Sequence, residues 1–488
     1  MEWIVSHRVP LVFLCLYVLL LVYHAWVGHR ATRGVLDYYV GGRRMGGWAL
    51  GLSFFATYSS TNSYIGLAGQ SYSFGVSWFL LGVFLVGFSV LAWLFVAPRL
   101  RRVTEQLGSL TVSDFLGFRF SSTAVRSAAA AIILFSSLFY MTAIFKGAGE
   151  LLAAFLHLPY AAAVVLIFTL VVFYTYTGGF ISVVKTDAVQ GGMMIVAAVV
   201  LFAATYARVD GWSGLVAALS HSPRALSDGR PLVEGLLSLR GPAPPLILLG
   251  LIFAGSIKFL VEPRQLSRFY ALKDGRAARR GLVASTVAIA LVYACILPLG
   301  LLARAVYPTG VEDTDRIVPL LLTQGEIVGS HLAAFILVVL LAAAMSSLDS
   351  VLLVVASTWQ RDLVEVWRPS PSEARMLAGT RFYVLVLAVV TMLIALRPPG
   401  GIVALTVFSG SIYAACFLPA LLFGLFWRGG SAAAVLGSFA TGLVALAAWP
   451  PLTRVWPALQ DTHAVFPAVL LSSGIFLALS LFRRARPA

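Results

Sequence analysis

The segment FATYSSTNSYIG, Phe55 to Gly66, interrupts a long apolar run with eight consecutive side chains that carry a hydroxyl or an amide, Thr57 to Tyr64. One or two hydroxyls in a membrane helix are ordinary, because Ser and Thr can bond to a carbonyl of the preceding turn. Eight in a row surround the helix and cannot all be hidden on one packed face. Such polarity is tolerated at membrane depth only where it lines a cavity or packs against protein. The segment therefore indicates an interrupted membrane helix beside a cavity, with a Ser/Thr-rich packing seam as the alternative.

Composition places the chain among membrane proteins. Of its 488 residues 60% are hydrophobic and only 11% are charged, with a mean hydropathy of +0.91, whereas about a quarter of the residues in soluble domains are charged. A bilayer core of roughly 30 Å needs about 20 apolar residues per helical span. We expect an all-α polytopic membrane protein in which residues 1–488 form one transmembrane domain. Apolar runs bounded by charge, Pro or Gly predict thirteen spans, near 4–27, 46–73, 76–98, 124–156, 160–176, 184–206, 243–262, 277–307, 328–358, 377–396, 400–426, 431–449 and 463–482.

The charge distribution predicts an orientation. The net charge of +15 comes from basic residues that alternate with apolar runs, which argues against a nucleic-acid partner. With the amino terminus outside, 24 of the 35 Lys and Arg residues fall on the cytoplasmic side, Arg264 and Arg268 among them, as the positive-inside rule favours. The carboxyl terminus is then cytoplasmic. Cys15, Cys295 and Cys416 lie in apolar segments without paired or metal-type spacing, so neither a disulfide nor a metal site of that kind is expected.

A second hydroxyl cluster lies in AAAMSSLDS, Ala342 to Ser350. Ser346 and Ser350 are four residues apart and share a helix face, and Asp349 stands between them in the sequence. A carboxylate at membrane depth costs roughly 2.5 to 3.5 kcal/mol on insertion scales and is for that reason a functional candidate. Hydroxyls, carbonyls and one or two carboxylates suit a hard monovalent cation. The pattern indicates a cation site where this segment meets the polar interruption.

A third segment, YTYTGGFISVVKTDAVQGG, runs from Tyr174 to Gly192. Its pair of adjacent glycines at 178 and 179 is typical of a turn between two spans. Asp187 follows in the next span, where a carboxylate could cap the first helical turn or contribute to an ion site. The residues leave both interpretations open.

Taken together, these segments resemble the sodium:solute symporter family, which contains bacterial proline and pantothenate permeases and sodium–sugar transporters. The resemblance extends over nearly the whole chain and is carried by GGR at 41–43, YIGLAG at 64–69, YTYTGG at 174–179, TDAVQ at 186–190, EPRQLSRFYALKD at 262–274 and SSLDS at 346–350. It implies a LeuT-type core of two inverted repeats, 45–206 and 243–426, with one extra span before the core and two after it. Each repeat would open with a broken helix, and residues 57–64 would be the unwound part of the first. The resemblance also implies the bacterial inner membrane as the location.

The resemblance further implies Na⁺ as the coupling ion. The principal sodium site would use the backbone carbonyls of Ala56, Ser59 and Ala343 and the hydroxyls of Ser346 and Ser347. Some members have a second sodium site, which here would map to Asp187, Ser346, Asp349 and Ser350. A carboxylate at position 349 resembles the pantothenate permease branch. Two neighbouring carboxylates could also share a proton, so proton coupling stays open.

A solute pocket is implied as well, lined by Tyr58, Asn62, Ser63, Tyr140, Glu262 and Thr406. Glu262 departs from the family pattern, in which an amide commonly precedes the proline; its carboxylate could receive an amine or pair with an arginine such as Arg264. Lys146 could face the cavity and attract a carboxylate, pair with Glu150 four residues on, or extend to water. Lys258 lies close to the expected second break and is equally open.

These expectations converge on secondary active transport. One or two Na⁺ ions would drive the uptake of a small polar organic solute by alternating access. An organic anion such as a monocarboxylate or pantothenate, or a zwitterion such as proline, is favoured over a sugar because Lys146 and Glu262 lie near a pocket with few amides. A membrane sensor would need an output domain, and only about six residues follow the last span. The chain lacks HExxH and nucleophile-elbow motifs, so no enzyme is expected, and the sequence leaves the oligomeric state open.

Overall fold

The computed structural model describes residues 7–220, 231–307, 311–323, 327–369 and 372–484. Within these ranges the chain is almost entirely helical and forms no β-strand beyond one isolated bridge between Met45 and Leu272. The predicted all-α membrane fold is confirmed. The α-helices are α2 (Arg8–Ala31), α3 (Val35–Val40), α4 (Gly47–Tyr58), α5 (Leu67–Phe74), α6 (Leu80–Leu91), α7 (Ala97–Leu107), α8 (Val112–Arg119), α9 (Thr123–Leu156), α10 (Tyr160–Arg208), α11 (Gly211–Ser220), α12 (Leu232–Leu236), α13 (Pro245–Ser256), α14 (Lys258–Val261), α15 (Pro263–Tyr270), α16 (Gly275–Val306), α17 (Ile317–Thr323), α18 (Ser330–Thr358), α19 (Glu365–Trp367), α20 (Glu373–Ala395), α21 (Ile402–Phe426), α22 (Ala432–Val455) and α23 (Val465–Arg484).

Eleven helical stretches in the described part of the chain are long and apolar enough to cross a membrane, two fewer than the thirteen spans predicted. Two of the eleven are far longer than one crossing requires: Asn62–Leu107 has 46 residues and Tyr160–Arg208 has 49. At 1.5 Å per residue, a straight helix of that second length would measure about 74 Å, more than twice the hydrocarbon thickness of a bilayer. Neither stretch can therefore be one straight membrane helix.

Both long stretches fold back on themselves at a glycine. Gly179 in α10 has φ 64° and ψ −173°, a region that is essentially restricted to glycine. The hydroxyl of Tyr174 then reaches Thr186 Oγ1 over 2.6 Å, although twelve residues of straight helix would separate them by about 18 Å. Gly75 has φ 65°, and just beyond it Trp78 Nε1 donates to a carbonyl eleven residues earlier in the chain, 3.1 Å away. The predicted Gly-Gly turn is confirmed, whereas the count of thirteen stays a prediction.

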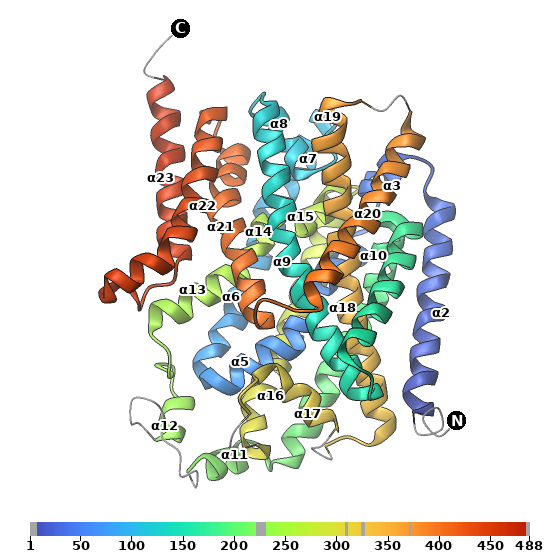
Figure 1. Ribbon diagram of the computed structural model, residues 1–488, viewed down its shortest axis with the longest axis vertical. Coiled ribbons are helices and arrows are strands. Elements are labelled where there is room, and N and C mark those ends of the chain that lie inside the picture. Colours follow the sequence, from blue (N-terminus) through green and yellow to red (C-terminus); the bar gives the residue numbers. More distant parts are fainter. Residues whose placement is uncertain (1–6, 221–230, 308–310, 324–326, 370–371, 485–488) are drawn as a thin grey trace.

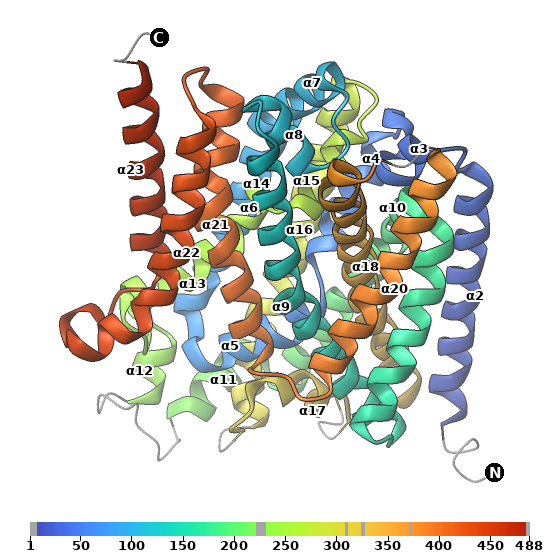
Figure 2. The same cartoon turned by 45° about the horizontal axis from the view of Figure 1, so that its top comes forward.

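The helices form an interior group and a lipid-exposed periphery. In their most apolar windows α18 is 94% buried and α21 is 83% buried, whereas α2, α20 and α23 are each 28% buried. In both views α2 lies at one edge of the molecule and α22 and α23 lie at the other, with α18 between them (Figures 1 and 2). The described part of α2 begins, and α23 ends, on opposite sides. The hydroxyls of α18 are thus carried into the protein rather than toward lipid.

Side-chain caps fix the helix ends outside the apolar layer. Backbone N–H groups in the first turns of α8, α9, α16, α20 and α22 donate to Thr111, Ser122, Asp274, Ser372 and Ser431, the residue types that favour this position. The bond from the Ala277 N–H lowers the pKa of Asp274. Between α22 and α23, burial lowers the pKa of His463 to about 4, and its Nδ1 accepts a bond of 3.3 Å from the Val465 N–H. A neutral imidazole therefore supports the start of α23.

Candidate functional site

The first polar segment contains a true helix break. Helix α4 ends at Tyr58, and Ser59 has φ −78° and ψ 79°, outside the helical region. The chain returns to helix almost at once, because the side chain and carbonyl of Ser60 accept bonds from the N–H groups of Asn62 (3.2 Å) and Ser63 (2.9 Å). A short π-helix, Asn62–Gly66, continues the span. The predicted unwound segment of residues 57–64 is therefore too long: only Ser59 and Ser60 leave the helix.

All eight polar residues of this segment are buried, with exposed fractions of 0 to 7%. The helix turns them into the protein, as the cavity interpretation requires, and the interruption excludes a continuous helical seam.

The second helix break lies at Glu262, between α14 and α15. Glu262 has φ −78° and ψ 124°, and Pro263 follows as the first residue of α15. A residue before proline is pushed out of the helical region because the proline ring collides with its backbone. Proline at the first helical position lacks only an N–H that would have no helical partner. Both predicted broken helices are thus present.

The five residues expected at the principal sodium site are all completely buried. The Ser346 hydroxyl lies 3.0 Å from the Ala56 carbonyl and 3.1 Å from the Ala343 carbonyl. Ser347 donates instead to the next carbonyl of α4, that of Thr57, at 2.9 Å. Ser59 follows at the break, and its buried hydroxyl has no hydrogen-bond partner. These oxygens are neutral carbonyls and hydroxyls, a donor set that fits a hard monovalent cation and leaves its charge uncompensated by any carboxylate.

Two of the four residues expected at a second sodium site, Asp187 and Ser350, bond to Arg268. Arg268 Nη2 donates to Asp187 Oδ2 at 2.8 Å and to Ser350 Oγ at 2.6 Å, and its side chain is 1% exposed. Asp187 lies in the helix well beyond the turn at Gly179, so the first-turn cap left open by the sequence is wrong. Asp349 is completely buried, and no lysine or arginine of the described residues forms an ion pair with its carboxylate. The guanidinium of Arg268 therefore occupies two of the side chains that were expected to bind a second Na⁺.

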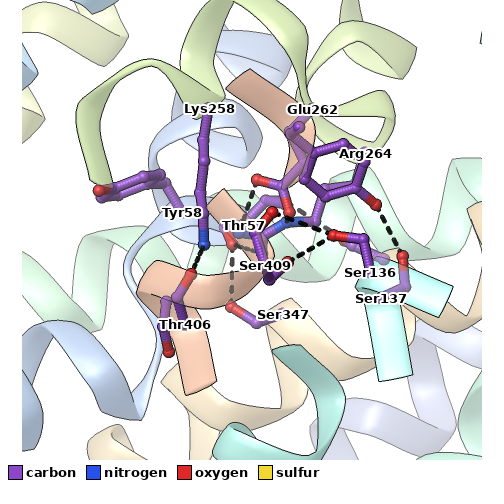
Figure 3. A network of polar contacts seen from close by, with 12 residues as sticks. Thr57, Tyr58, Ser136, Ser137, Lys258, Glu262, Arg264, Ser347, Thr406 and Ser409 are labelled. Carbon is purple, nitrogen blue, oxygen red and sulfur yellow. Dashed lines mark hydrogen bonds and ion pairs between the residues drawn. The ribbon is translucent and has the colours of Figure 1, made fainter. Parts of the chain in front are cut away.

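A further polar network spans the break in the second broken helix (Figure 3). Arg264 pairs with both oxygens of Glu262, at 2.7 Å and 3.1 Å, and its Nη1 donates to the Thr57 carbonyl of the first broken helix. Its guanidinium carbon lies 3.8 Å from the centre of the Tyr140 ring. Of the two roles left open for Glu262, the pair with an arginine is confirmed. Arg264 and Arg268, which were counted with the cytoplasmic segments, are at most 1% exposed and lie inside the apolar stretch Pro245–Tyr270, so their assignment to an exposed segment is wrong.

Of the other residues expected to contact the solute, four lie beside the two helix breaks and the fifth, Thr406, comes from α21. Tyr58 donates to the Gly255 carbonyl at 3.1 Å, and Ser63 bonds to the hydroxyl of Tyr293 at 2.7 Å. Asn62 is 7% exposed, and its Oδ1 has no hydrogen-bond partner. These three residues and Tyr140 therefore border the two breaks. Thr406 joins them from α21, where its carbonyl accepts a bond of 2.7 Å from the Lys258 ammonium.

Lys146 forms ion pairs. Its ammonium lies 3.0 Å from Asp315 and 3.5 Å from Glu150, so the pair with Glu150 anticipated from the spacing is confirmed. The Asp315 carboxylate also accepts the N–H of Ile402, at the start of α21, at 3.1 Å. Lys146 therefore helps to tie α9, α21 and the segment before α17 together.

Sequence reasoning missed the burial of two arginines, Arg264 and Arg268. The signal was visible in EPRQLSRF, where two arginines stand four residues apart beside an apolar run. It also missed a hydroxyl cluster between α9 and α21: Ser136 bonds to Ser409 at 2.9 Å, and Ser137 bonds to Tyr413 at 2.9 Å. Both cations and hydroxyls point to a polar interior within an apolar bundle.

Two interrupted helices that meet a hydroxyl-bearing interior helix define a secondary transporter, since this arrangement exposes backbone carbonyls to a cation and a solute at membrane depth. The model of the sodium:solute symporter family matches residues 38–442. The chain belongs to the sodium:solute symporter family. It is accordingly a multi-pass membrane transporter and not an enzyme, and Na⁺ is its coupling ion.

Individual relatives agree with this assignment. The chain is 26% identical over 471 residues to a sodium/pantothenate symporter of Haemophilus influenzae, which covers 96% of this chain and 94% of the relative. It is 28% identical over 455 residues to a sodium/proline symporter of Staphylococcus aureus, covering 90% and 85%.

Solved structures agree on the fold. The substrate-bound, outward-open structure of a Na⁺-coupled sialic acid symporter superimposes with a TM-score of 0.80 at 21% identity, covering 99% of this chain and 98% of that one. A closed nucleobase-cation-symport-1 family transporter gives a TM-score of 0.52 at 15% identity, covering 92% and 95%. The LeuT-type fold is thereby confirmed.

Proposed function

We propose that the protein takes up a small polar organic solute together with Na⁺ held by Ala56, Ser59, Ala343, Ser346 and Ser347. The observation that carries this proposal is the position of the Ser346 hydroxyl, 3.0 Å from a carbonyl of the broken helix and 3.1 Å from a carbonyl of its own helix α18. A cation at this point would connect the two helices, so its binding would favour one arrangement of them over another.

The solute would bind beside the two breaks, where Tyr58, Asn62, Ser63, Tyr140, Glu262 and Thr406 gather. Two relatives carry pantothenate and proline in their names, and both of these solutes contain a carboxylate. An organic anion such as a monocarboxylate or pantothenate, or an amino acid such as proline, is therefore the class we favour. We assign no solute contact to Lys146, because Asp315 and Glu150 already neutralise it.

Alternating access would come from movement of two inverted repeats, 45–206 and 243–426, around this fixed site. The amino terminus would lie outside and the carboxyl terminus in the cytoplasm of a bacterial inner membrane. Removing the buried Arg264 and Arg268 from the count of cytoplasmic residues leaves the positive-inside bias intact.

Proton coupling is the second candidate, and one observation favours it. The carboxylate of Asp349 is completely buried and has no ion-pair partner among the described residues, and an isolated buried charge is avoided either by cation binding or by protonation. Arg268 already binds Asp187 and Ser350, which leaves less room for a second Na⁺. Na⁺ in the principal site and a proton on Asp349 are compatible with each other.

Uptake into proteoliposomes tests these proposals. Radiolabelled pantothenate, proline and lactate are offered under an inward Na⁺ gradient, under an inward proton gradient without Na⁺, and under neither. We expect accumulation under the Na⁺ gradient and its loss when Ser346 and Ser347 are changed to Ala. Uptake that follows the proton gradient alone would favour the second candidate. Uptake that ignores both gradients would reject symport.

A further inference from the structure

Lys258 is a buried lysine with no carboxylate within ion-pair distance among the described residues. Its side chain reaches across to α21, where the ammonium donates to the Thr406 carbonyl at 2.7 Å, and the residue is only 1% exposed. Within the described residues no carboxylate lies within the 4.0 Å that defines an ion pair with this ammonium. An ammonium has three N–H donors, and a single carbonyl accepts one of them. A buried charge in this condition is costly unless something else compensates it.

The acidic residue nearest to Lys258 in the sequence already has an ion-pair partner. Glu262 lies one helical turn after Lys258, but both of its oxygens are bonded to Arg264. Lys258, Arg264 and Glu262 together therefore carry a net charge of +1. The two cations are also close to each other, since Nζ of Lys258 and the guanidinium carbon of Arg264 lie 4.8 Å and 3.8 Å from the centre of the same Tyr140 ring. They are thus less than about 9 Å apart and repel each other.

The position of Lys258 links it to the proposed solute pocket. Thr406 and Tyr140 contact its ammonium directly, and Tyr58 bonds to Gly255, three residues earlier. Figure 3 shows Lys258 extending toward Thr406, with Tyr58 beside it. The passage of the lysine stem depends on a residue without a side chain, because a Cβ at Gly410 would lie 2.8 Å from Lys258 Cε. A bond to Thr406 alone would need only a neutral donor, so the charge calls for a separate explanation.

We propose that Lys258 receives the carboxylate of the transported solute, which makes the solute a small monocarboxylate. This inference rests on the proposed function and deepens it: the ammonium would use its remaining N–H donors on the carboxylate, and the anion would neutralise the excess charge beside Arg264. Charge-assisted hydrogen bonds of this type are short and strong. The inference also moves the anion-recognising role from Lys146, which has two carboxylate partners, to Lys258, which has none within ion-pair distance in the described part of the chain.

Thermal unfolding of the purified full-length protein tests the inference, because a ligand that binds only the folded state raises the Tm. The probes are three pairs in which one member lacks the carboxylate: pantothenate and pantothenol, lactate and lactamide, and L-proline and L-prolinamide. Each is measured in sodium methanesulfonate and in choline methanesulfonate. We expect at least one acid to raise the Tm in Na⁺ while its partner does not, and we expect Lys258→Met and Lys258→Gln to weaken that acid's binding by about 10- to 100-fold.

The controls separate this inference from the proposed function. Lys185→Met removes an exposed lysine of α10 and should leave the response to the acid unchanged. Na⁺ alone should still raise the Tm of both Lys258 variants, which shows that they are folded; if Na⁺ alone has no effect on the unmodified protein, the sodium proposal fails independently. The inference is overturned if no acid gives a shift, if a partner that lacks the carboxylate matches its acid, or if both Lys258 variants keep the shift. A shift produced by NaCl alone that requires Lys258 would assign the site to an inorganic anion instead.

Discussion

Substitution of Ser346 by Ala is the most direct perturbation of the proposed sodium site. It removes one hydroxyl that lies 3.0 Å from the Ala56 carbonyl and 3.1 Å from the Ala343 carbonyl. The Ala343 carbonyl belongs to the continuous helix α18, whereas the Ala56 carbonyl near the end of α4 loses the bond from Ser346. Alanine also has the higher helix propensity. We therefore expect the variant to fold and to bind Na⁺ less well.

The size of the effect follows from the ligand set. The hydroxyl is one of five oxygens proposed to bind Na⁺, and an interaction of a polar group with a charged one contributes about 1.5 to 3 kcal/mol. Since about 1.4 kcal/mol corresponds to a factor of ten in affinity, the Na⁺ concentration that gives half of the maximal effect should rise about 10- to 150-fold. Loss of solute affinity should accompany it, because coupling between two ligands is reciprocal.

The assay is a Na⁺ titration of the Tm of the purified protein, with choline replacing Na⁺ at constant ionic strength. Ser438→Ala is a matched control: Ser438 is also completely buried and also bonds to a carbonyl three residues earlier, at 2.9 Å, but it lies in the peripheral helix α22. The reasoning is refuted if the two variants show the same Na⁺ midpoint as the unmodified protein, or if Ser438→Ala shifts it as much as Ser346→Ala does.

Three further outcomes are expected, each measured by thermal unfolding. Gly179→Ala should lower stability by about 1 to 3 kcal/mol because of its backbone conformation, whereas Gly192→Ala, with open space around it, should not; equal effects would contradict the turn. Asp187→Asn should lower the free energy of unfolding by about 3 to 5 kcal/mol, because it leaves the charge of Arg268 without a counter-ion. Adding Arg268→Met should restore part of this loss, and no recovery in the double variant would show that the two residues are not coupled. Burial lowers the pKa of His463 from its usual value to about 4. The contribution of the neutral imidazole to the free energy of unfolding should therefore be complete above pH 6.5 and decline by about 3 kcal/mol toward pH 4. His463→Gln should abolish this decline.

The parts of the fold that could be predicted are those that depend on short segments of the sequence. Apolar runs indicated the spans, and the two adjacent glycines indicated the reversal that Gly179 makes; the second break was expected from the family resemblance alone. The length of the first break could not be predicted in the same way. Eight polar residues suggested a long unwound segment. Ser60 instead accepts bonds from the N–H groups of Asn62 and Ser63, and these bonds return the chain to helix after two positions.

The candidate site likewise contains some residues that could be predicted from the sequence and others that could not. The residues from α18 and α4 that gather around Ser346 could be anticipated because the family resemblance maps ion-binding positions onto them. The buried arginines could not, because a hydropathy reading takes a charged residue as the end of a span. Arg268 is placed inside the bundle by Asp187, 81 residues earlier in the chain, and a partner at that distance is not visible in a local window. Lys146 shows the opposite case, since its partner Glu150 is four residues away and was predicted.

The two breaks also offer a physical route for coupling between ion and solute. Consecutive carbonyls at the end of α4 serve different groups: that of Ala56 accepts from Ser346, whereas that of Thr57 accepts from both Ser347 and Arg264. The two carbonyls lie in consecutive peptide planes that meet at Thr57 Cα, so a Na⁺ ion that draws the first toward α18 would act on the orientation of the second through the φ and ψ of Thr57. The second carbonyl positions the guanidinium that lies against Tyr140, where we place the solute. Ion and solute would thus act on the same few atoms of one interrupted helix, so that binding of either favours the geometry that the other requires.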